Sequence, residues 1–273
     1  MSECRNVSRV SRPDLDPALP GAGPPLTARS VLASTLLGTD PPELPVAQLV
    51  AVAALFGITE NRARVALTRM VRAGEAVTDA GRYRLTGRLA ERGKRQQQSR
   101  RPARATWRGG WTMVVLTGER RLAVERAEHR RSLLAARCAE LREGVWMRPD
   151  NLPLALPPDL VERAQRMTAR PDEPVALAER LWDLTGWQRR ASVLVDRLAT
   201  APSADVLAEG FVLSAAVLRH LQADPLLPDE LLPTSWPGDE LRAVYDGWDT
   251  AYRRLLSDWH RAWRDRSARS SVR

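Results

Sequence analysis

The sequence has few of the residues that build disulfide scaffolds and metal centres. Only two cysteines, Cys4 and Cys138, and three histidines occur among 273 residues. Two cysteines are too few for a disulfide scaffold and fit a reducing compartment. The histidines, at positions 129, 220 and 260, stand at no metal-ligand spacing with either cysteine. We therefore predict no metal site and no disulfide framework.

Long apolar runs are also missing. No stretch approaches the roughly 18 apolar residues of a membrane span, and no basic-then-apolar signal segment opens the sequence. Apolar residues still make up 44% of the chain, close to the roughly 45–50% of globular proteins, which excludes disorder throughout. We expect a globular, cytoplasmic protein of roughly one to three domains with no membrane contact.

Three common catalytic and nucleotide-binding motifs, GxxxxGK[ST], GxGxxG and GxSxG, do not occur in the sequence. Gly93-Lys94 lacks the glycine loop that would precede it in a phosphate-binding motif. The acidic residues of the central region stand beside arginines, as in Glu125-Arg126, which is typical of solvated ion pairs. No pair of acids stands out as a two-metal nuclease site. We predict no catalytic residue and no cofactor.

Lysine is nearly absent, since Lys94 is the single lysine among 42 basic residues. We attribute this bias mainly to a GC-rich genome. The placement of charge is more informative, because residues 60–104 hold 13 basic and four acidic residues while the remainder holds 29 of each. One segment thus carries the whole formal charge of +9. Such a concentration is expected for contact with a polyanion, whereas a solvated charged face usually interleaves both signs.

The order of elements around this segment predicts a winged helix-turn-helix over residues 27–90. The expected elements are a helix over 28–37 capped by Thr27, an edge strand at Leu44, a helix from Pro45 to about residue 56, a helix over 60–73 and a hairpin over 76–85. Gly57 makes the turn before the third helix, and Thr59 caps that helix. In this architecture the helix after the turn enters the major groove of DNA.

The third helix has one apolar and one basic face. Ala63, Leu67, Met70 and Val71 share a face and are expected to pack inward. The opposite face and the hairpin offer side chains for phosphates and base edges. The residues that we predict to contact DNA are Asn61, Arg62, Arg64, Thr68, Arg69, Arg72, Arg82, Tyr83 and Arg84. The alternative is an amphipathic helix whose arginines only contact solvent and bind no DNA.

Beyond residue 90 the pattern predicts a linker and two further domains. Residues 91–105 are polar with no apolar period, which indicates a basic linker. The expected elements are strands over 111–117 and 145–147, helices over 122–139 and 158–167, and another strand or loop up to Pro174. They predict a ferredoxin-like α+β domain over residues 106–175, with a helical hairpin as the alternative. An all-α domain is predicted over residues 176–265, with helices over 176–198, 203–223 and 239–264. Gly186 is a possible weak point in the first of these helices.

The two ends of the chain lack periodicity. Residues 1–26 are rich in proline and predict a disordered tail, and the polar residues 266–273 predict a frayed one. The expected fold class is therefore a multidomain α+β protein with an N-terminal winged helix-turn-helix, a central ferredoxin-like domain and a C-terminal all-α domain.

Three segments resemble the PaaX-type repressors of phenylacetate degradation. They are GITENRARVALTRMVRAG at 57–74, the pair WTMVVLTGERR and EGVWMRP at 111–121 and 143–149, and DPLLPDELLPTSWPG at 224–238. The resemblance covers residues 28–251. Arg64 and Arg69 fall on the family's usual arginine positions in the recognition helix. Glu75 stands where the family often has a bulky apolar residue.

The resemblance implies a homodimeric, nucleoid-associated transcriptional repressor of a catabolic operon that binds a double-stranded operator with an inverted repeat. It also implies release by an acyl-CoA effector such as phenylacetyl-CoA. An acyl-CoA needs cations for its phosphates and an apolar slot for its acyl part. The residues that we predict to supply them are Trp146, Trp187, Arg189, Arg190, Arg219 and Trp236. Because the central domain of such proteins resembles Cas2 nucleases, a metal-dependent nuclease is the alternative function.

Overall fold

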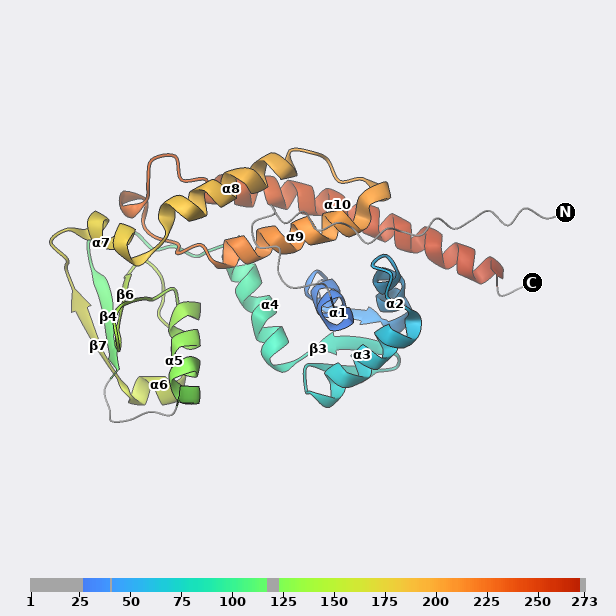
Figure 1. The fold of residues 1–273 in the computed structure, drawn as a ribbon, viewed down its shortest axis with the longest axis horizontal. Helices are drawn as coiled ribbons and strands as arrows, with labels where there is room; N and C mark the ends of the chain where they lie inside the picture. Colours follow the sequence, from blue (N-terminus) through green and yellow to red (C-terminus); the bar gives the residue numbers. More distant parts are fainter. Residues whose placement is uncertain (1–26, 40, 117–122, 271–273) are drawn as a thin grey trace. The chain divides into compact units, whose positions relative to one another are not determined.

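The computed structural model describes residues 27–39, 41–116 and 123–270 (Figure 1). The predicted disordered tail, residues 1–26, lies outside this range. The described chain forms two compact units. The first unit holds the described residues of Met1–Arg100, Arg190–Gln222 and Gly238–Arg273, and the second holds those of Arg101–Arg189 and Ala223–Pro237.

The first unit begins with the three predicted helices. These are α1 (Ala28–Leu37), α2 (Val46–Ala54) and α3 (Glu60–Arg72). Thr27 caps α1 as predicted, because its side-chain oxygen accepts a hydrogen bond from the backbone N–H of Ser30 at 3.1 Å. Gly57 makes the turn between α2 and α3 at a φ of 66°, which costs glycine little.

A small antiparallel sheet completes the predicted winged helix-turn-helix. Its strands are β1 (Glu43–Pro45), β2 (Ala76–Asp79) and β3 (Arg82–Leu85), in the order β1-β3-β2. The strand predicted at Leu44 is confirmed and lies at an edge of the sheet. Ala80 and Gly81 link β2 to β3 with φ angles of 45° and 74°, the left-handed values that a tight two-residue hairpin turn requires.

Residues 91–105, expected to form a basic linker, are helical for most of their length. Helix α4 spans Gly87–Arg100 and packs against α9 (Leu207–Gln222). Leu89, Gln96 and Ser99 are its buried residues, and their spacing of seven and three places them on one face. Because two of these three side chains are polar, the segment shows no apolar period, and hydropathy alone could not reveal the helix.

The C-terminal part of the chain is helical, as predicted. Its elements are α7 (Pro174–Leu181), α8 (Leu184–Leu198), the 3₁₀ turns η1 (Ala204–Val206) and η2 (Asp229–Leu231), α9, and α10 (Gly238–Ser270). The frayed tail predicted over residues 266–273 is helical through Ser270, and 271–273 lie outside the described residues. No helix in the described part of the chain is long and apolar enough to cross a membrane.

The single helix predicted over residues 176–198 is wrong, because the chain breaks between α7 and α8. The break falls at Asp183, whose carboxylate accepts a hydrogen bond from the backbone N–H of Gly186 at 2.9 Å. This contact is a helix N-cap, so α8 starts at Leu184, two residues before the glycine that was expected to be the weak point.

The second unit contains a four-stranded antiparallel sheet. Its elements follow the order β4 (Trp111–Leu116), α5 (Ala123–Ala135), β5 (Ala139–Arg142), β6 (Val145–Pro149), α6 (Pro158–Glu162) and β7 (Ala164–Ala169). The strands lie in the order β5-β6-β4-β7. A βαββαβ chain with this strand order has the ferredoxin-like topology, so that prediction is confirmed and the helical hairpin is wrong.

The sequence pattern missed strand β5 and placed the strand or loop expected after the second helix too late in the chain. The helix predicted to reach residue 139 ends at Ala135, and Arg137, at a φ of 64°, precedes β5. The helix predicted over 158–167 ends at Glu162, after which β7 pairs with β4 along its whole length. Most side chains of β7 are exposed because it is an edge strand, so it lacks the apolar alternation of a half-buried strand.

The segment DPLLPDELLPTSWPG belongs to the core of the second unit. Leu227 and Leu231 pack in one apolar cluster with Trp111 of β4, and the partly buried Trp236 lies against it. The side chain of Asn151 donates a hydrogen bond to the carbonyl of Leu226 at 2.8 Å. The proline-punctuated segment therefore has a structural role in covering the sheet.

Candidate nucleic-acid interface

Helix α3 is fixed in place by its first turn and its apolar face. The Thr59 hydroxyl oxygen accepts a hydrogen bond from the backbone N–H of Arg62, with an oxygen–nitrogen distance of 3.5 Å, and so caps the helix. Ala63, Leu67 and Met70 are buried as predicted, Ala66 joins them, and Val71 is partly buried. This packing leaves the opposite face of α3 to solvent.

The predicted DNA-contacting residues of α3 all lie exposed. They are Asn61, Arg62, Arg64, Thr68, Arg69 and Arg72. The structure therefore brings four guanidinium groups and two hydrogen-bonding polar groups onto the exposed side of one helix. Arginine can bind a phosphate or form a bidentate contact with a guanine edge, so this surface suits groove contact.

One acidic residue shares this surface. The Nε atom of Arg64 lies 2.8 Å from a carboxylate oxygen of Glu60, one helical turn earlier. Both side chains are more than half exposed, at 53% and 61%. An exposed pair at this spacing contributes only about 0.3–0.5 kcal/mol. A phosphate or a base edge can therefore replace Glu60 as the partner of Arg64 at little cost.

The hairpin presents two of its three predicted residues outward. Arg82 and Arg84 are exposed, and alternation along β3 places them on the same face of the sheet. Arg82 forms an ion pair with Glu43 of β1. Tyr83 lies on the other face of the strand, as does the buried Leu85. The outer face of the wing is therefore supplied by the arginines rather than by the tyrosine.

Glu75 anchors the start of the hairpin to α1. The Nε atom of Arg29 donates a hydrogen bond to a Glu75 carboxylate oxygen at 2.8 Å, and a second guanidinium nitrogen pairs with the other oxygen. The hydrogen bond from Arg29 lowers the pKa of Glu75 and outweighs the opposing effect of burial, and the positive charge of Arg29 lowers this pKa further. The two-point contact with Arg29 of α1 thus explains why a carboxylate fits at position 75.

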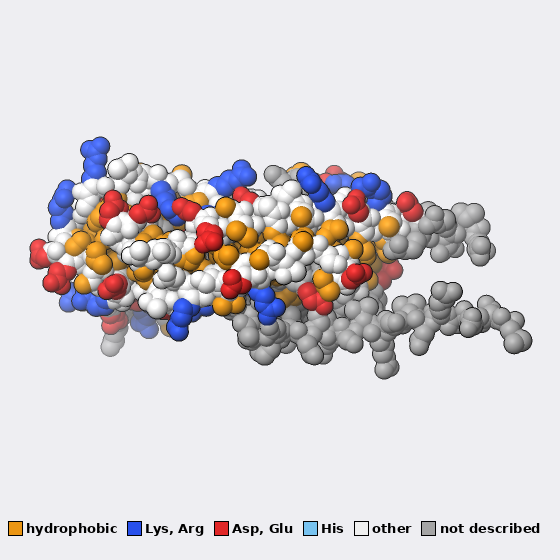
Figure 2. Space-filling view, turned by 90° about the horizontal axis from the view of Figure 1, so that it is seen from above, with side chains coloured by type: hydrophobic (Ala, Val, Ile, Leu, Met, Phe, Trp, Pro, Cys, Tyr) orange, Lys and Arg blue, Asp and Glu red, His pale blue; other side chains and the backbone are white. Residues whose placement is uncertain are grey.

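Charges of both signs are interspersed over α8 and α10 (Figure 2). Exposed residues of α10 include Asp239, Glu240, Arg254 and Asp258. Helix α3, by contrast, carries four exposed arginines and a single acidic residue, Glu60. A surface with interspersed charges of both signs, as on α8 and α10, is typical of solvent-exposed helices. The concentration of positive charge lies instead on α3 and the wing.

The six residues predicted to bind an effector do not meet at one place within either unit. Trp187 and Trp236 stack in the second unit, with ring centres 4.4 Å apart. Trp146 belongs to another apolar cluster of that unit, and the guanidinium of Arg130 lies 5.3 Å from its ring centre. Arg189 belongs to the second unit, whereas Arg190 and Arg219 belong to the first.

A cavity of about 770 Å³ in the first unit was not foreseen from the sequence. Helices α1, α2, α4, α9 and α10 contribute its lining. The charged and titratable lining residues are Arg92, Arg219, Asp249, Tyr252, Arg253, His260 and Arg261, and the larger apolar ones are Leu37, Leu44, Val52, Phe211, Leu218 and Leu256. Arg219 alone belongs to the predicted effector set. These residues come from five separate helices and the strand β1, so no sequence motif unites them.

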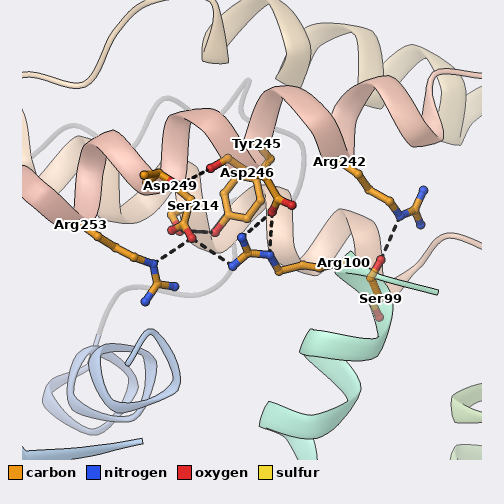
Figure 3. Close-up of polar contacts among 9 residues, drawn as sticks. Ser99, Arg100, Ser214, Arg242, Tyr245, Asp246, Asp249 and Arg253 are labelled. Atoms are coloured by element: carbon orange, nitrogen blue, oxygen red, sulfur yellow. Dashed lines mark hydrogen bonds and ion pairs between the residues drawn. The ribbon is translucent and has the colours of Figure 1, made fainter. Parts of the chain in front are cut away.

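A polar network adjoins this cavity (Figure 3). Arg100, the last residue of α4, donates a hydrogen bond to Asp249 of α10 at 3.0 Å, and Arg253 donates to the same carboxylate oxygen at 2.8 Å. The hydroxyls of Ser214 and Tyr245 lie 2.8 Å apart. Burial, with a further contribution from Asp249, raises the pKa of Tyr245, so its phenol stays protonated.

The part of the chain that the structure describes offers no residue set for the alternative function, a metal-dependent nuclease. Within the described residues, no three His, Cys, Asp or Glu side chains are placed to hold a metal ion. In the second unit, His129 pairs with Asp159, with Nε2 and Oδ2 separated by 3.5 Å. Burial raises the pKa of the Cys138 thiol to about 11. The contact of His129 with Asp159 and the burial of Cys138 are explained by packing within the second unit.

Comparison with known proteins identifies the family. Residues 27–93 match the family described as PaaX-like protein, and residues 182–265 match the PaaX-like protein C-terminal domain. The chain is similar to the solved structure of the uncharacterized protein Rv0674 from Mycobacterium tuberculosis, with 45% sequence identity, 85% of this chain and 98% of that chain covered, and a TM-score of 0.68. None of the curated proteins matches. The chain therefore belongs to the PaaX-like protein family.

Proposed function

We propose that this protein is a transcriptional repressor of a catabolic operon that binds duplex DNA through α3 and the wing. Membership of the PaaX-like family is consistent with a transcriptional regulator and implies DNA binding. The single observation that carries the proposal is the exposed arginine face of α3, set on a winged helix-turn-helix whose opposite face is buried. A repressor of this kind acts in the cytoplasm, at the nucleoid.

In this proposal α3 lies in the major groove. Arg64 and Arg69 contact base edges, where a bidentate contact with guanine discriminates by about 1–3 kcal/mol. Arg62 and Arg72 flank them. Arg84 of the wing contacts the phosphate backbone, where an arginine adds affinity uniformly across sequences.

We further propose that the protein acts as a homodimer on an inverted repeat. A single winged domain covers about half of a typical operator, and repressors gain affinity by placing two such domains on a two-fold symmetric site. Light scattering at micromolar protein concentration should give the mass of a dimer. A monomer mass both with and without DNA would contradict this part of the proposal.

The effector of the repressor is proposed to be an acyl-CoA such as phenylacetyl-CoA. The resemblance to repressors of phenylacetate degradation supports this choice, and the first unit offers a cavity with cationic and apolar lining. The effector releases DNA only if it binds the free protein more tightly than the DNA-bound protein, by about 1.4 kcal/mol for each tenfold loss of affinity.

DNA binding is tested by selecting bound sequences from a random duplex pool, followed by mobility-shift titrations. Arg64→Ala and Arg69→Ala should relax the sequence preference, whereas Arg84→Ala should reduce the slope of log affinity against log salt by about 1. Arg254→Ala, an exposed arginine of α10, is the matched control. The proposal fails if the double variant of Arg64 and Arg69 keeps the sequence preference of the wild-type protein.

A further inference from the structure

Helix α4 carries a second concentration of positive charge, separate from α3 and the wing. Residues 60–86, which include α3 and the wing, hold six basic and three acidic residues. Residues 87–104, which include α4, hold seven basic residues and one acidic residue. Six of the nine surplus positive charges of residues 60–104 therefore follow the wing. DNA contacts made by α3 and the wing alone leave this larger share of the charge without a function.

Two of the basic residues of α4 have roles within the first unit. Arg100 is mostly buried and forms ion pairs with Asp246 and Asp249 of α10 (Figure 3). Lys94 pairs with Glu91, the acidic residue of its own helix, with 3.1 Å between Nζ and a carboxylate oxygen. The other basic residues of α4 are arginines, and they differ from Arg100 in being exposed.

These three arginines form an exposed stripe along α4. Arg88, Arg92 and Arg95 are spaced by four and three residues, so they lie on one side of the helix. At about 1.5 Å of rise per residue, the stripe is about 10 Å long. Each DNA strand carries one phosphate per about 3.4 Å of helix axis, so the stripe is long enough for about three phosphates. An ion pair at such an exposed position is weak, so a phosphate can replace a carboxylate partner.

Hydrogen bonds hold the start of α4 at the end of α3. The hydroxyl of Thr86 donates a hydrogen bond to the carbonyl of Gly74 at 3.0 Å, and the backbone N–H of Thr86 donates to the carbonyl of Glu75 at 2.9 Å. At Gly87, the first residue of α4, a Cβ atom would lie 3.0 Å from the same Gly74 oxygen. The stripe therefore begins close to the end of α3 and follows directly after β3 of the wing (Figure 1).

Packing fixes another side of α4. Leu89, Gln96 and Ser99 are buried, and the helix packs against α9 and α1. The stripe is thus carried by a helix that is ordered before any ligand binds. A basic linker that folds on binding would lose affinity to the cost of ordering, whereas a preformed helix avoids that cost. A rigid row of arginines directly after the wing suits a backbone contact that continues from the wing.

We propose that α4 is a second DNA contact, in which Arg88, Arg92 and Arg95 bind phosphates of the duplex next to those that the wing contacts. This inference rests on the proposed function, because α3 supplies the base contacts that set the position of the protein on DNA. The stripe reads no bases. It adds affinity uniformly across sequences and extends the backbone contact of each half-site beyond the wing.

The test compares four full-length proteins by fluorescence anisotropy titrations on a duplex of fixed, arbitrary sequence at about 50–200 mM salt. They are the wild-type protein and the double variants Arg88→Gln with Arg95→Gln, Arg88→Lys with Arg95→Lys, and Arg197→Gln with Arg254→Gln. Arg92 is left unchanged because it also lines the cavity of the first unit. Arg197 of α8 and Arg254 of α10 are exposed arginines of the same unit, so the last variant is a control with the same change of charge.

The glutamine variant of Arg88 and Arg95 should bind the duplex about tenfold or more weakly at the lowest salt concentration. The slope of log affinity against log salt should fall by about 2, because each lost phosphate contact removes about 0.9 from it. The lysine variant should keep the affinity within about threefold, since lysine binds a phosphate as a point charge. The control should keep the slope of the wild-type protein.

A second measurement locates the contact on the DNA. Single phosphates of a duplex selected from the random pool are replaced by neutral methylphosphonates. Positions at which the replacement weakens binding of the wild-type protein but not of the glutamine variant are those that α4 contacts. They should adjoin the positions found in the same way with Arg84→Gln of the wing, because α4 begins two residues after β3. Positions scattered along the duplex would contradict the proposed contact.

The role of α4 is overturned if the glutamine variant keeps the wild-type slope, or if the control loses as much slope as that variant. It is also overturned if the lysine variant binds as weakly as the glutamine variant, since the arginines would then have a structural role. Glutamine, lysine and arginine have similar helix propensities, and circular dichroism checks that each variant is folded.

The sequence preference separates this inference from the proposed function. If Arg64→Ala and Arg69→Ala relax the preference while the glutamine variant keeps its slope, the repressor stands and α4 does not contact DNA. If the glutamine variant loses slope while the variants of Arg64 and Arg69 keep the preference, the phosphate contact of α4 stands and base recognition by α3 is refuted.

Discussion

The guanidinium of Arg100 lies 5.0 Å from the centre of the Tyr245 ring and donates hydrogen bonds to Asp246 and Asp249 on the same helix (Figure 3). Arg100 ends α4, and its three partners belong to α10. At the same junction, Arg242 of α10 donates to the carbonyl of Ser99 at 3.0 Å. Within the first unit, these contacts fasten the helix that follows the wing to the last helix.

Replacing Arg100 should destabilise the first unit strongly. Its side chain is 13% exposed and that of Asp249 is 6% exposed. Removing one partner of a buried ion pair typically costs about 3–5 kcal/mol, and we expect Arg100→Met to cost about 3 kcal/mol because Arg253 still compensates Asp249. Urea unfolding followed by circular dichroism measures the change. An unfolding midpoint equal to that of the exposed control Arg254→Met would show that the network adds nothing to stability.

The pair of Arg29 and Glu75 should make stability depend on pH in the acidic range. The pKa of Glu75 is lowered in the folded protein, so its stabilising effect is complete above the unfolded-state pKa of about 4.3 and is lost as the pH falls through the folded-state value. The difference in unfolding free energy between wild-type protein and Arg29→Met should therefore be constant near pH 7 and shrink below about pH 4. Denaturant titrations at several pH values would refute this if the difference stayed the same down to pH 3.

Two glycines in the C-terminal helices should respond oppositely to alanine. A Cβ atom at Gly210 would lie 2.6 Å from a ring carbon of Tyr252, whose hydroxyl is fixed by a hydrogen bond to the carbonyl of Leu207. We expect Gly210→Ala to destabilise the protein by about 1–3 kcal/mol. At Gly247 of α10 a Cβ meets nothing within 4 Å, so Gly247→Ala should stabilise the helix by about 0.5–1 kcal/mol. Equal shifts in melting temperature for the two variants would contradict this packing.

The N-terminal fold could be predicted because its signals are local in the sequence. Thr27 and Thr59 cap helices through their own side chains, and Gly57 and Gly74 adopt positive φ angles at the ends of helices. The alternation in residues 76–85 around a turn at Ala80-Gly81 defines a hairpin without any distant partner. The burial of Ala63, Leu67 and Met70 likewise followed from helical spacing.

The elements that escaped prediction depend on partners far along the chain. Two of the three buried residues of helix α4, Gln96 and Ser99, are polar, so the helix lacks the apolar periodicity that would reveal it from hydropathy. Strand β7 gains its hydrogen bonds from β4, some fifty residues earlier, and its own side chains remain mostly exposed. The cavity between Arg92 and Arg219 arises in the same way, since it exists only once α4 and α9 have packed. The exposed arginine face of α3 was visible in the sequence, whereas a cavity lined by five helices was not.

Glu60 should limit the affinity of the recognition helix for DNA. Its carboxylate pairs with Arg64 at 2.8 Å on the exposed face of α3, where it also repels phosphates. Glu60→Gln removes the repulsion and leaves Arg64 available to DNA, and we expect about threefold tighter binding to duplex DNA at 50 mM salt with a smaller gain at 300 mM, because salt screens exposed charges. The loss of a favourable carboxylate from the first turn of α3 costs about 0.3–1 kcal/mol of stability, which leaves the protein folded under these conditions.

Mobility-shift titrations at the two salt concentrations measure the effect of Glu60→Gln. Asp258→Asn is the control, since Asp258 also forms an exposed ion pair, with Arg261 at 3.0 Å, but on α10. Both variants raise the net charge by one, so a general electrostatic effect would tighten DNA binding equally in both. A gain confined to Glu60→Gln places the DNA phosphates beside the N-terminal turn of α3. Equal gains, or weaker binding by Glu60→Gln, would instead show that DNA does not approach this turn.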